Sequence, residues 1–172
     1  GKDEDETVRL TITVLAETKN VAGIETRVVE EREECDGEIV EISRNFLAIS
    51  KKTGCVFYFG EEVDIYEDWQ VRSHSGAWLA GEKDARFGLL MPSLPLLGAR
   101  YFQEIAPGAA MDRAEVVGLL ETVETPAGKF DGCLKTKESS AIEPGSEFKY
   151  YAPGIGLVRE EHLRLIEHGR KS

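Results

Sequence analysis

The sequence predicts an all-β protein of about ten long antiparallel strands, forming an up-and-down barrel or a strongly curved, half-closed sheet. Apolar and polar residues alternate over several runs, which is typical of strands with one buried face. Turn signals near residues 21, 36, 52 and 67 lie about 15 residues apart, which favours a meander of long strands over a βαβ pattern. No convincing long helix interrupts this pattern.

The first half of the chain has the clearest strand signals. Residues 8–15 alternate strictly and predict a half-buried strand. Asp36-Gly37 is the strongest hairpin signal, because both positions tolerate the positive φ angles of a type I′ turn. The strands predicted in this half cover residues 8–15, 24–34, 38–50, 55–60 and 69–74.

The second half is less regular but still favours strands. The two prolines of residues 91–98 exclude a central strand there and predict a loop. Residues 112–124 contain many helix formers, but Gly118 and the turn at residues 126–128 favour a strand. Residues 87–92 are apolar on both faces. The strands predicted in this half cover residues 100–105, 112–124, 130–139, 147–152 and 155–167.

Length and charge limit the classes of function. The 172 residues suit one β domain over residues 1–172, and a start at Gly1 without Met leads us to expect a missing N-terminal part. The net charge of −11 argues against nucleic acid or an anionic membrane as partner. No apolar run approaches the ~20 residues of a membrane span. The acidic runs at residues 3–6, 30–34 and 61–67 predict solvated strand ends and turns, with Ca²⁺ binding as a weaker alternative because no EF-hand spacing is present.

The three cysteines predict neither a metal site nor a disulfide framework. Cys35, Cys55 and Cys133 form no C-x-x-C pair and lie near no histidine at ligand spacing. Cys35 and Cys55 flank opposite ends of one predicted strand, tens of Å apart at about 3.3 Å per residue. We therefore expect free thiols and no cofactor.

The candidate site comes from polar residues of the predicted strands, because nucleophile motifs and phosphate-binding loops are absent. Lys135 shares one face of its strand with Lys137, opposite Glu138. The residues that we predict to bind a ligand are Glu104, Glu115, Lys135, Glu147, Lys149 and Tyr151. Two interpretations stay open: a salt-bridged outer face, or an inward face that offers a polar anchor to a ligand carboxylate or hydroxyl. Six aromatic residues could line a pocket or pack in the core: Phe57, Tyr58, Phe59, Tyr66, Trp69 and Trp78.

Three segments carry a family resemblance: GAWLAGEKDARFGLLMPSLPLLG, ETPAGKFDGCLKTKE and EPGSEFKYYAPGIGLVREE. They resemble an uncharacterised bacterial family with a CLKT…EPG…KYYAPGxGLV pattern. The resemblance implies an exported or lipoprotein-like β-rich domain, with a further strand before Gly1, and supplies no catalytic residues. The chain departs from the pattern over residues 98–110, and Thr26 stands where a cysteine is frequent.

Two hypotheses of function follow. The first is a non-enzymatic, extracytoplasmic binding module, periplasmic or at the cell surface, for an apolar or amphipathic small molecule or a protein partner. The alternative is a hydrolase or isomerase that uses carboxylates and a lysine, for example Glu104, Glu115, Glu138 and Lys135. The alternative requires these groups to converge within hydrogen-bond reach.

Overall fold

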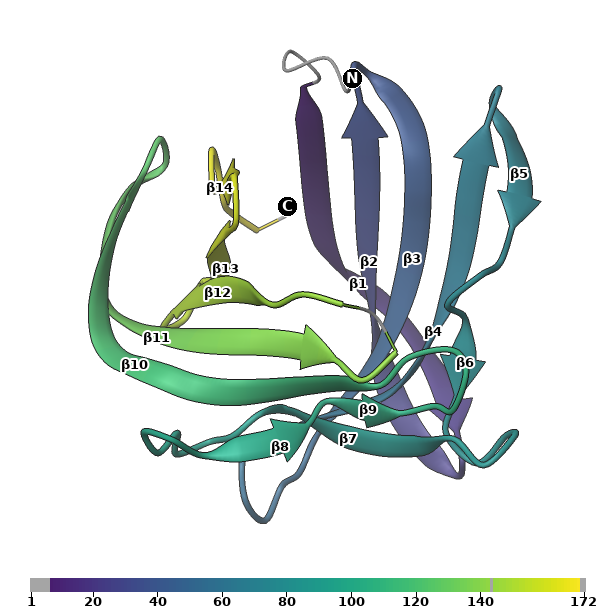
Figure 1. The fold of residues 1–172 in the computed structure, drawn as a ribbon, viewed down its shortest axis with the longest axis horizontal. Helices are drawn as coiled ribbons and strands as arrows, with labels where there is room; N and C mark the ends of the chain where they lie inside the picture. The colour runs from purple at the N-terminus through teal and green to yellow at the C-terminus, as the bar shows by residue number, and fades with distance from the viewer. Residues whose placement is uncertain (1–6, 143, 171–172) are drawn as a thin grey trace. The chain divides into compact units, whose positions relative to one another are not determined.

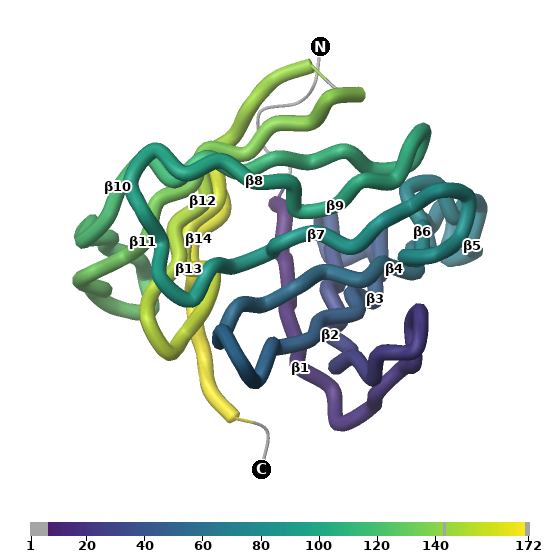
Figure 2. Tube along the Cα trace, turned by 90° about the horizontal axis from the view of Figure 1, so that it is seen from below, coloured from purple at the N-terminus to yellow at the C-terminus, as the bar shows by residue number. Residues whose placement is uncertain are grey.

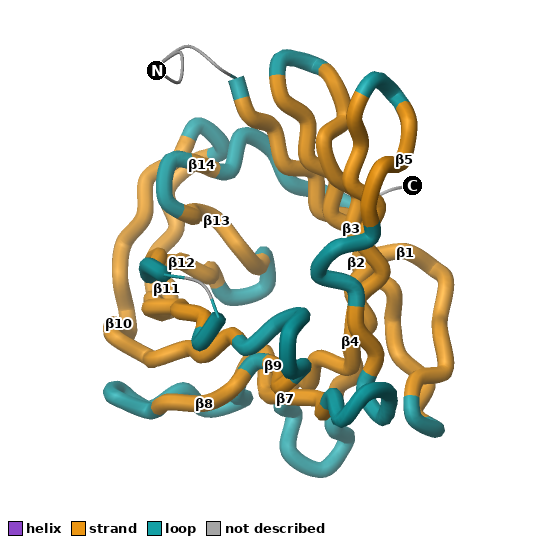
Figure 3. The backbone as a smooth tube through the Cα atoms, turned by 45° about the vertical axis from the view of Figure 1, so that its right-hand side comes forward, coloured by secondary structure: helices purple, strands orange, loops and turns teal. Residues whose placement is uncertain are grey.

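The computed structural model describes residues 7–142 and 144–170. In this part of the chain 67% of the residues lie in strands and none in helices, as Figure 3 shows. The predicted all-β class is confirmed. The acidic run at residues 3–6 and the first residue of the predicted turn 143–145 lie outside the described residues.

The chain divides into two compact units. The N-terminal unit contains the described residues up to Ser93 together with Gln103–Met111. The C-terminal unit contains Leu94–Phe102 and the described residues from Asp112 onward. A single domain over residues 1–172 stays a prediction.

The N-terminal unit contains one antiparallel sheet of eight strands in the order β1-β2-β3-β4-β7-β9, with β5 and β6 also paired to β4. Figure 1 shows β1, β2 and β3 side by side. The β2–β3 hairpin turns at Asp36 (φ 51°) and Gly37 (φ 84°), which confirms the predicted turn. The strands are β1 (Val8–Val21), β2 (Ile24–Cys35), β3 (Glu38–Ile49), β4 (Val56–Glu67), β5 (Gln70–Ser73), β6 (Trp78–Leu79), β7 (Arg86–Met91) and β9 (Glu104–Ile105).

The core of the N-terminal unit lies where β1, β2, β3, β4 and β6 contribute apolar side chains. Its largest members are Phe46, Phe59 and Trp78, so part of the predicted aromatic set packs in the core. The expectation that residues 8–15 bury one face is wrong for Val8, Ile12 and Val14, which are 41%, 42% and 69% exposed. β1 is an edge strand and has a neighbouring strand on one side only.

The C-terminal unit contains the second sheet, with strand order β14-β13-β12-β11-β10-β8. β10 and β11 curve strongly in Figure 1, because three register shifts along the pair insert extra residues and bend the ladder. The predicted strand at residues 112–124 is confirmed as β10. The bounds are β8 (Arg100–Phe102), β10 (Asp112–Thr125), β11 (Gly128–Ser140), β12 (Glu147–Ala152), β13 (Gly156–Glu160) and β14 (Leu163–Arg164).

The predicted topology needs correction. The described strands number 14 rather than about ten, and they form two sheets in which no closed barrel is found. Residues 100–105 form two short strands, since β8 pairs with β10 and β9 pairs with β7. Residues 155–167 likewise form β13 and β14, because the chain reverses after Glu160. Figure 2 follows the trace through these connections.

Two smaller expectations can also be compared with the structure. Cys55 and Cys133 are free thiols, so Cys35 and Cys55 do not pair with each other, as the strand length predicts. None of the described segments is a helix long and apolar enough to cross a membrane.

Candidate functional site

The register of β11 against β12 decides which predicted residues share a face. Thr136 lies opposite Lys149, and Glu138 lies opposite Glu147. Cross-strand partners point to the same side of a sheet, so these four side chains share one face. Lys135 lies opposite Tyr150 and therefore points to the other face.

A bulge between β12 and β13 determines which residue of β13 lies opposite Lys149. Tyr151 pairs with Leu157, but Tyr150 pairs with Arg159, so one extra residue enters β13 between them. This shift places Glu160 opposite Lys149. Without the bulge Arg159 would take that position and set two cations against each other.

Lys149 is the centre of a charged cluster. Its Nζ lies 2.8 Å from Glu160 Oε1, 3.0 Å from Glu147 Oε1 and 3.3 Å from Glu138 Oε2. The side chain of Lys149 is 22% exposed and that of Glu138 only 8%. One ammonium and three carboxylates give the cluster a net charge of −2. We call these four residues the Lys149 cluster.

Hydroxyl groups complete the environment of Glu138. Thr136 Oγ1 and Tyr151 Oη both donate to Glu138 Oε1, at 3.0 Å and 3.2 Å. Tyr101 joins the same face, because it pairs with Ala114 and Ala114 pairs with Glu138. The Tyr101 hydroxyl is buried and has no hydrogen-bond partner among the described residues.

The electrostatics of the cluster hold Lys149 in its charged form. Burial alone would lower the pKa of Lys149, but the carboxylate of Glu138, followed by the other charges around it, raises the pKa above its ordinary value. Burial, and next the charge of Glu138, raises the pKa of Tyr151 well above its usual range. The same two causes raise the pKa of Tyr101 to about 12. Both phenols therefore stay protonated at neutral pH.

The other predicted residues lie elsewhere. Glu115 pairs with Arg100 at 3.0 Å and lies opposite Lys137, on the face away from the Lys149 cluster. Lys135 places its ammonium 4.3 Å from the ring centre of Phe148.

Glu104 belongs to β9 of the N-terminal unit and is 3% exposed. It is one of the charges that, after burial and Glu61, raise the pKa of Tyr58. Three of the six predicted residues therefore come together, namely Glu147, Lys149 and Tyr151.

The prediction missed Glu160, Thr136 and Tyr101, and named Glu138 only for the enzyme alternative. Strand parity could have added Glu138 and Thr136 once the β11–β12 register was assumed. Glu160 depends on a bulge that no local sequence signal marks. In the described part of the chain no group of three or more His, Cys, Asp or Glu residues is placed to hold a metal ion.

Comparison with known proteins adds no relative: no family model, no curated protein and no solved structure matches the chain. Function must therefore be inferred from the side chains themselves.

Proposed function

We propose that the chain is a non-enzymatic, extracytoplasmic binding module that holds the polar head of an apolar or amphipathic small molecule at the Lys149 cluster. The observation that carries this proposal is the buried Tyr101 hydroxyl, which has no hydrogen-bond partner among the described residues. A buried polar group without a partner destabilises a fold by about 1–3 kcal/mol. A ligand atom beside Tyr101 would remove this penalty.

The charges of the cluster favour a hydroxyl head over a carboxylate. Lys149 already contacts three carboxylates, so it has no excess positive charge to offer an anion. A hydroxyl can accept a hydrogen bond from Tyr101 and donate one to Glu138. The carboxylate ligand considered from sequence is therefore the weaker choice.

Apolar residues flank the polar groups on the same face and are buried, since Val116 is 0%, Ala114 2% and Leu134 8% exposed. Val116 pairs with Thr136, and Ala114 pairs with Glu138, so both lie directly beside the polar groups. Leu134 extends this buried apolar layer toward Tyr151, its partner in β12. Small and aliphatic side chains next to a few placed polar groups are typical of sites for amphipathic ligands.

The geometry gives less support to a hydrolase or isomerase. Lys149, which lies beside Glu138 although Lys135 was the lysine named for this alternative, stays protonated because carboxylates raise its pKa, so it is a poor base or nucleophile. Glu115 and Lys135 also point to the face opposite Glu138, so the residues named for this alternative do not converge within the C-terminal unit. The extracytoplasmic location rests on the family resemblance alone.

Isothermal titration with decanol and decanoate, both below their aggregation limits, tests the proposal. Decanol should bind saturably, and decanoate should bind at least tenfold more weakly. Tyr101→Phe should weaken decanol binding about fivefold to tenfold, the equivalent of one hydrogen bond of about 1–1.5 kcal/mol. Equal affinity for both compounds, or no effect of Tyr101→Phe, would contradict the proposal.

A further inference from the structure

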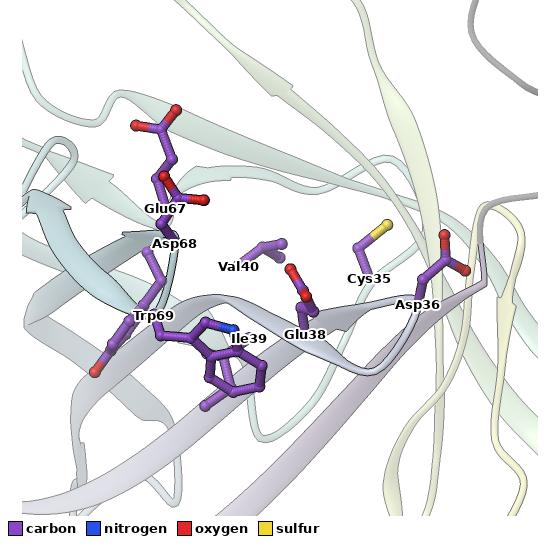
Figure 4. Close-up of a pocket in the computed structure, with 9 residues that line it drawn as sticks. Cys35, Asp36, Glu38, Ile39, Val40, Glu67, Asp68 and Trp69 are labelled. Carbon is purple, nitrogen blue, oxygen red and sulfur yellow. The ribbon is translucent and has the colours of Figure 1, made fainter.

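A separate pocket lies in the N-terminal unit, between the turn that joins β2 to β3 and the turn that joins β4 to β5 (Figure 4). Its volume is about 400 Å³, which is the size of a small organic ligand. Ile39 and Val40 of β3 contribute its apolar part. The Lys149 cluster contributes none of the lining residues.

The charges of this pocket all have one sign. Asp36, Glu38, Glu67 and Asp68 line it, and the nine lining residues include no lysine or arginine. Figure 4 shows Asp36 and Glu38 on one hairpin, and Glu67 and Asp68 on the other. Arg72 lies 3.8 Å from Glu67 and 4.0 Å from Asp68, distances that leave both carboxylates weakly neutralised on an exposed surface.

The aromatic lining distinguishes an organic cation from a metal ion. Trp69 lines the pocket with an indole that is 66% exposed, and Tyr66 lines it as well. An exposed indole attracts ammonium groups through its π face, most effectively beside negative charge. The carboxylates are not grouped for a metal, since no cluster of three or more ligating residues is placed to hold one among the described residues. A bulky, diffuse cation suits carboxylates that are spread around such a volume.

We propose that this pocket binds a small organic ammonium ion, with the cation against the Trp69 indole and the four carboxylates around it. Attraction to the ring contributes about 0.5–2 kcal/mol, so the indole accounts for a roughly twofold to thirtyfold difference in affinity. The sequence left open whether the six aromatic residues pack in the core or line a pocket. Phe59 and Trp78 pack in the core, whereas Tyr66 and Trp69 line this pocket.

Tetramethylammonium chloride is the probe for this site, with sodium chloride at equal ionic strength as the salt control. Binding is followed by tryptophan fluorescence, to which the exposed Trp69 and the buried Trp78 both contribute, and, independently, by isothermal titration. Trp69→Gly removes the indole at a position whose φ of 61° glycine adopts without strain, so the fold is retained. Glu38→Gln with Glu67→Gln removes two pocket charges, and Glu17→Gln with Glu25→Gln removes two exposed charges elsewhere.

The proposal expects saturable binding of tetramethylammonium that sodium does not reproduce. Trp69→Gly should weaken this binding by at least twofold, and the pocket double variant should weaken it by more than its matched surface control. An identical response to both salts would overturn the proposal. So would equal weakening by the two double variants, which would indicate attraction by net charge alone.

Discussion

Replacing Lys149 by methionine is the sharpest test of how the cluster is held together. The substitution keeps most of the volume of the side chain and removes the ammonium that separates three carboxylates. Removing one partner from a buried ion pair typically destabilises a protein by 3–5 kcal/mol, because the other charge stays buried and uncompensated.

The exposure of each carboxylate determines how much the free energy of unfolding falls in Lys149→Met. Glu138, with a side chain 8% exposed, contributes most of the effect, whereas Glu147 is 34% exposed and its pair is worth no more than about 1 kcal/mol. We therefore expect Lys149→Met to lower the free energy of unfolding by about 3 kcal/mol at pH 7, near the lower end of the range. Adding Glu138→Gln should restore part of this loss, since the most buried carboxylate is then neutral.

Urea unfolding followed by far-ultraviolet circular dichroism measures this effect by linear extrapolation. Lys135→Met is the matched control, because Lys135 lies on the same sheet and places its ammonium over the rings of Phe148 and Tyr150 on the opposite face; it should lose about 0.5–1 kcal/mol. The raised pKa of Lys149 means that the folded state binds its proton more tightly than the unfolded state. The stabilisation is then complete below the unfolded pKa of about 10.4 and is lost as the pH rises through the folded pKa. A loss below about 1 kcal/mol at pH 7, or an equal loss in Lys135→Met, would refute this account.

Three further predictions concern stability. Burial, and next the charge of Glu33, raises the pKa of Glu41. The stability that Glu41 contributes is therefore present at low pH and is lost as the pH rises through the folded pKa of Glu41. Glu41→Gln should accordingly stabilise the protein by about 0.2–1 kcal/mol at pH 7 and not at pH 3, as measured by urea unfolding at both values. Gly60→Ala should destabilise the protein by at least about 3 kcal/mol in the same assay, because the added Cβ would lie 2.4 Å from the carbonyl oxygen of Trp78 and Gly60 has a φ of 141°. A loss under about 1 kcal/mol would be inconsistent with this contact. Without ligand, Tyr101→Phe should leave thermal stability unchanged or raise it, since it removes a buried hydroxyl without a partner, and a clear drop in Tm would show that this hydroxyl is satisfied.

The strands were predictable because their signals are local. Alternation and turn chemistry identified the hairpin at Asp36-Gly37 and favoured a strand over a helix for residues 112–124. The division into two sheets was not predictable from the sequence. It depends on the pairing of the two short strands that flank Gln103, since β8 pairs with β10 and β9 pairs with β7. Such long-range pairing leaves no periodic signal in residues 100–105.

Register explains the part of the site that could be predicted. Parity within β12 correctly grouped Glu147, Lys149 and Tyr151 on one face. The same reasoning could not decide whether Lys135 or Glu138 lies on that face, because a shift of one residue exchanges them. The bulge that replaces Arg159 with Glu160 opposite Lys149 is a further step that sequence alone does not indicate.

Isotope-filtered NMR with ¹³C-labelled decanol locates the proposed ligand directly. We expect nuclear Overhauser effects between the methylene next to the decanol hydroxyl and the ring protons of Tyr101 and Tyr151, together with chemical-shift changes at Lys149. Effects confined to exposed apolar residues such as Leu94, Leu96 and Leu97, with none at these tyrosines, would contradict binding at the Lys149 cluster.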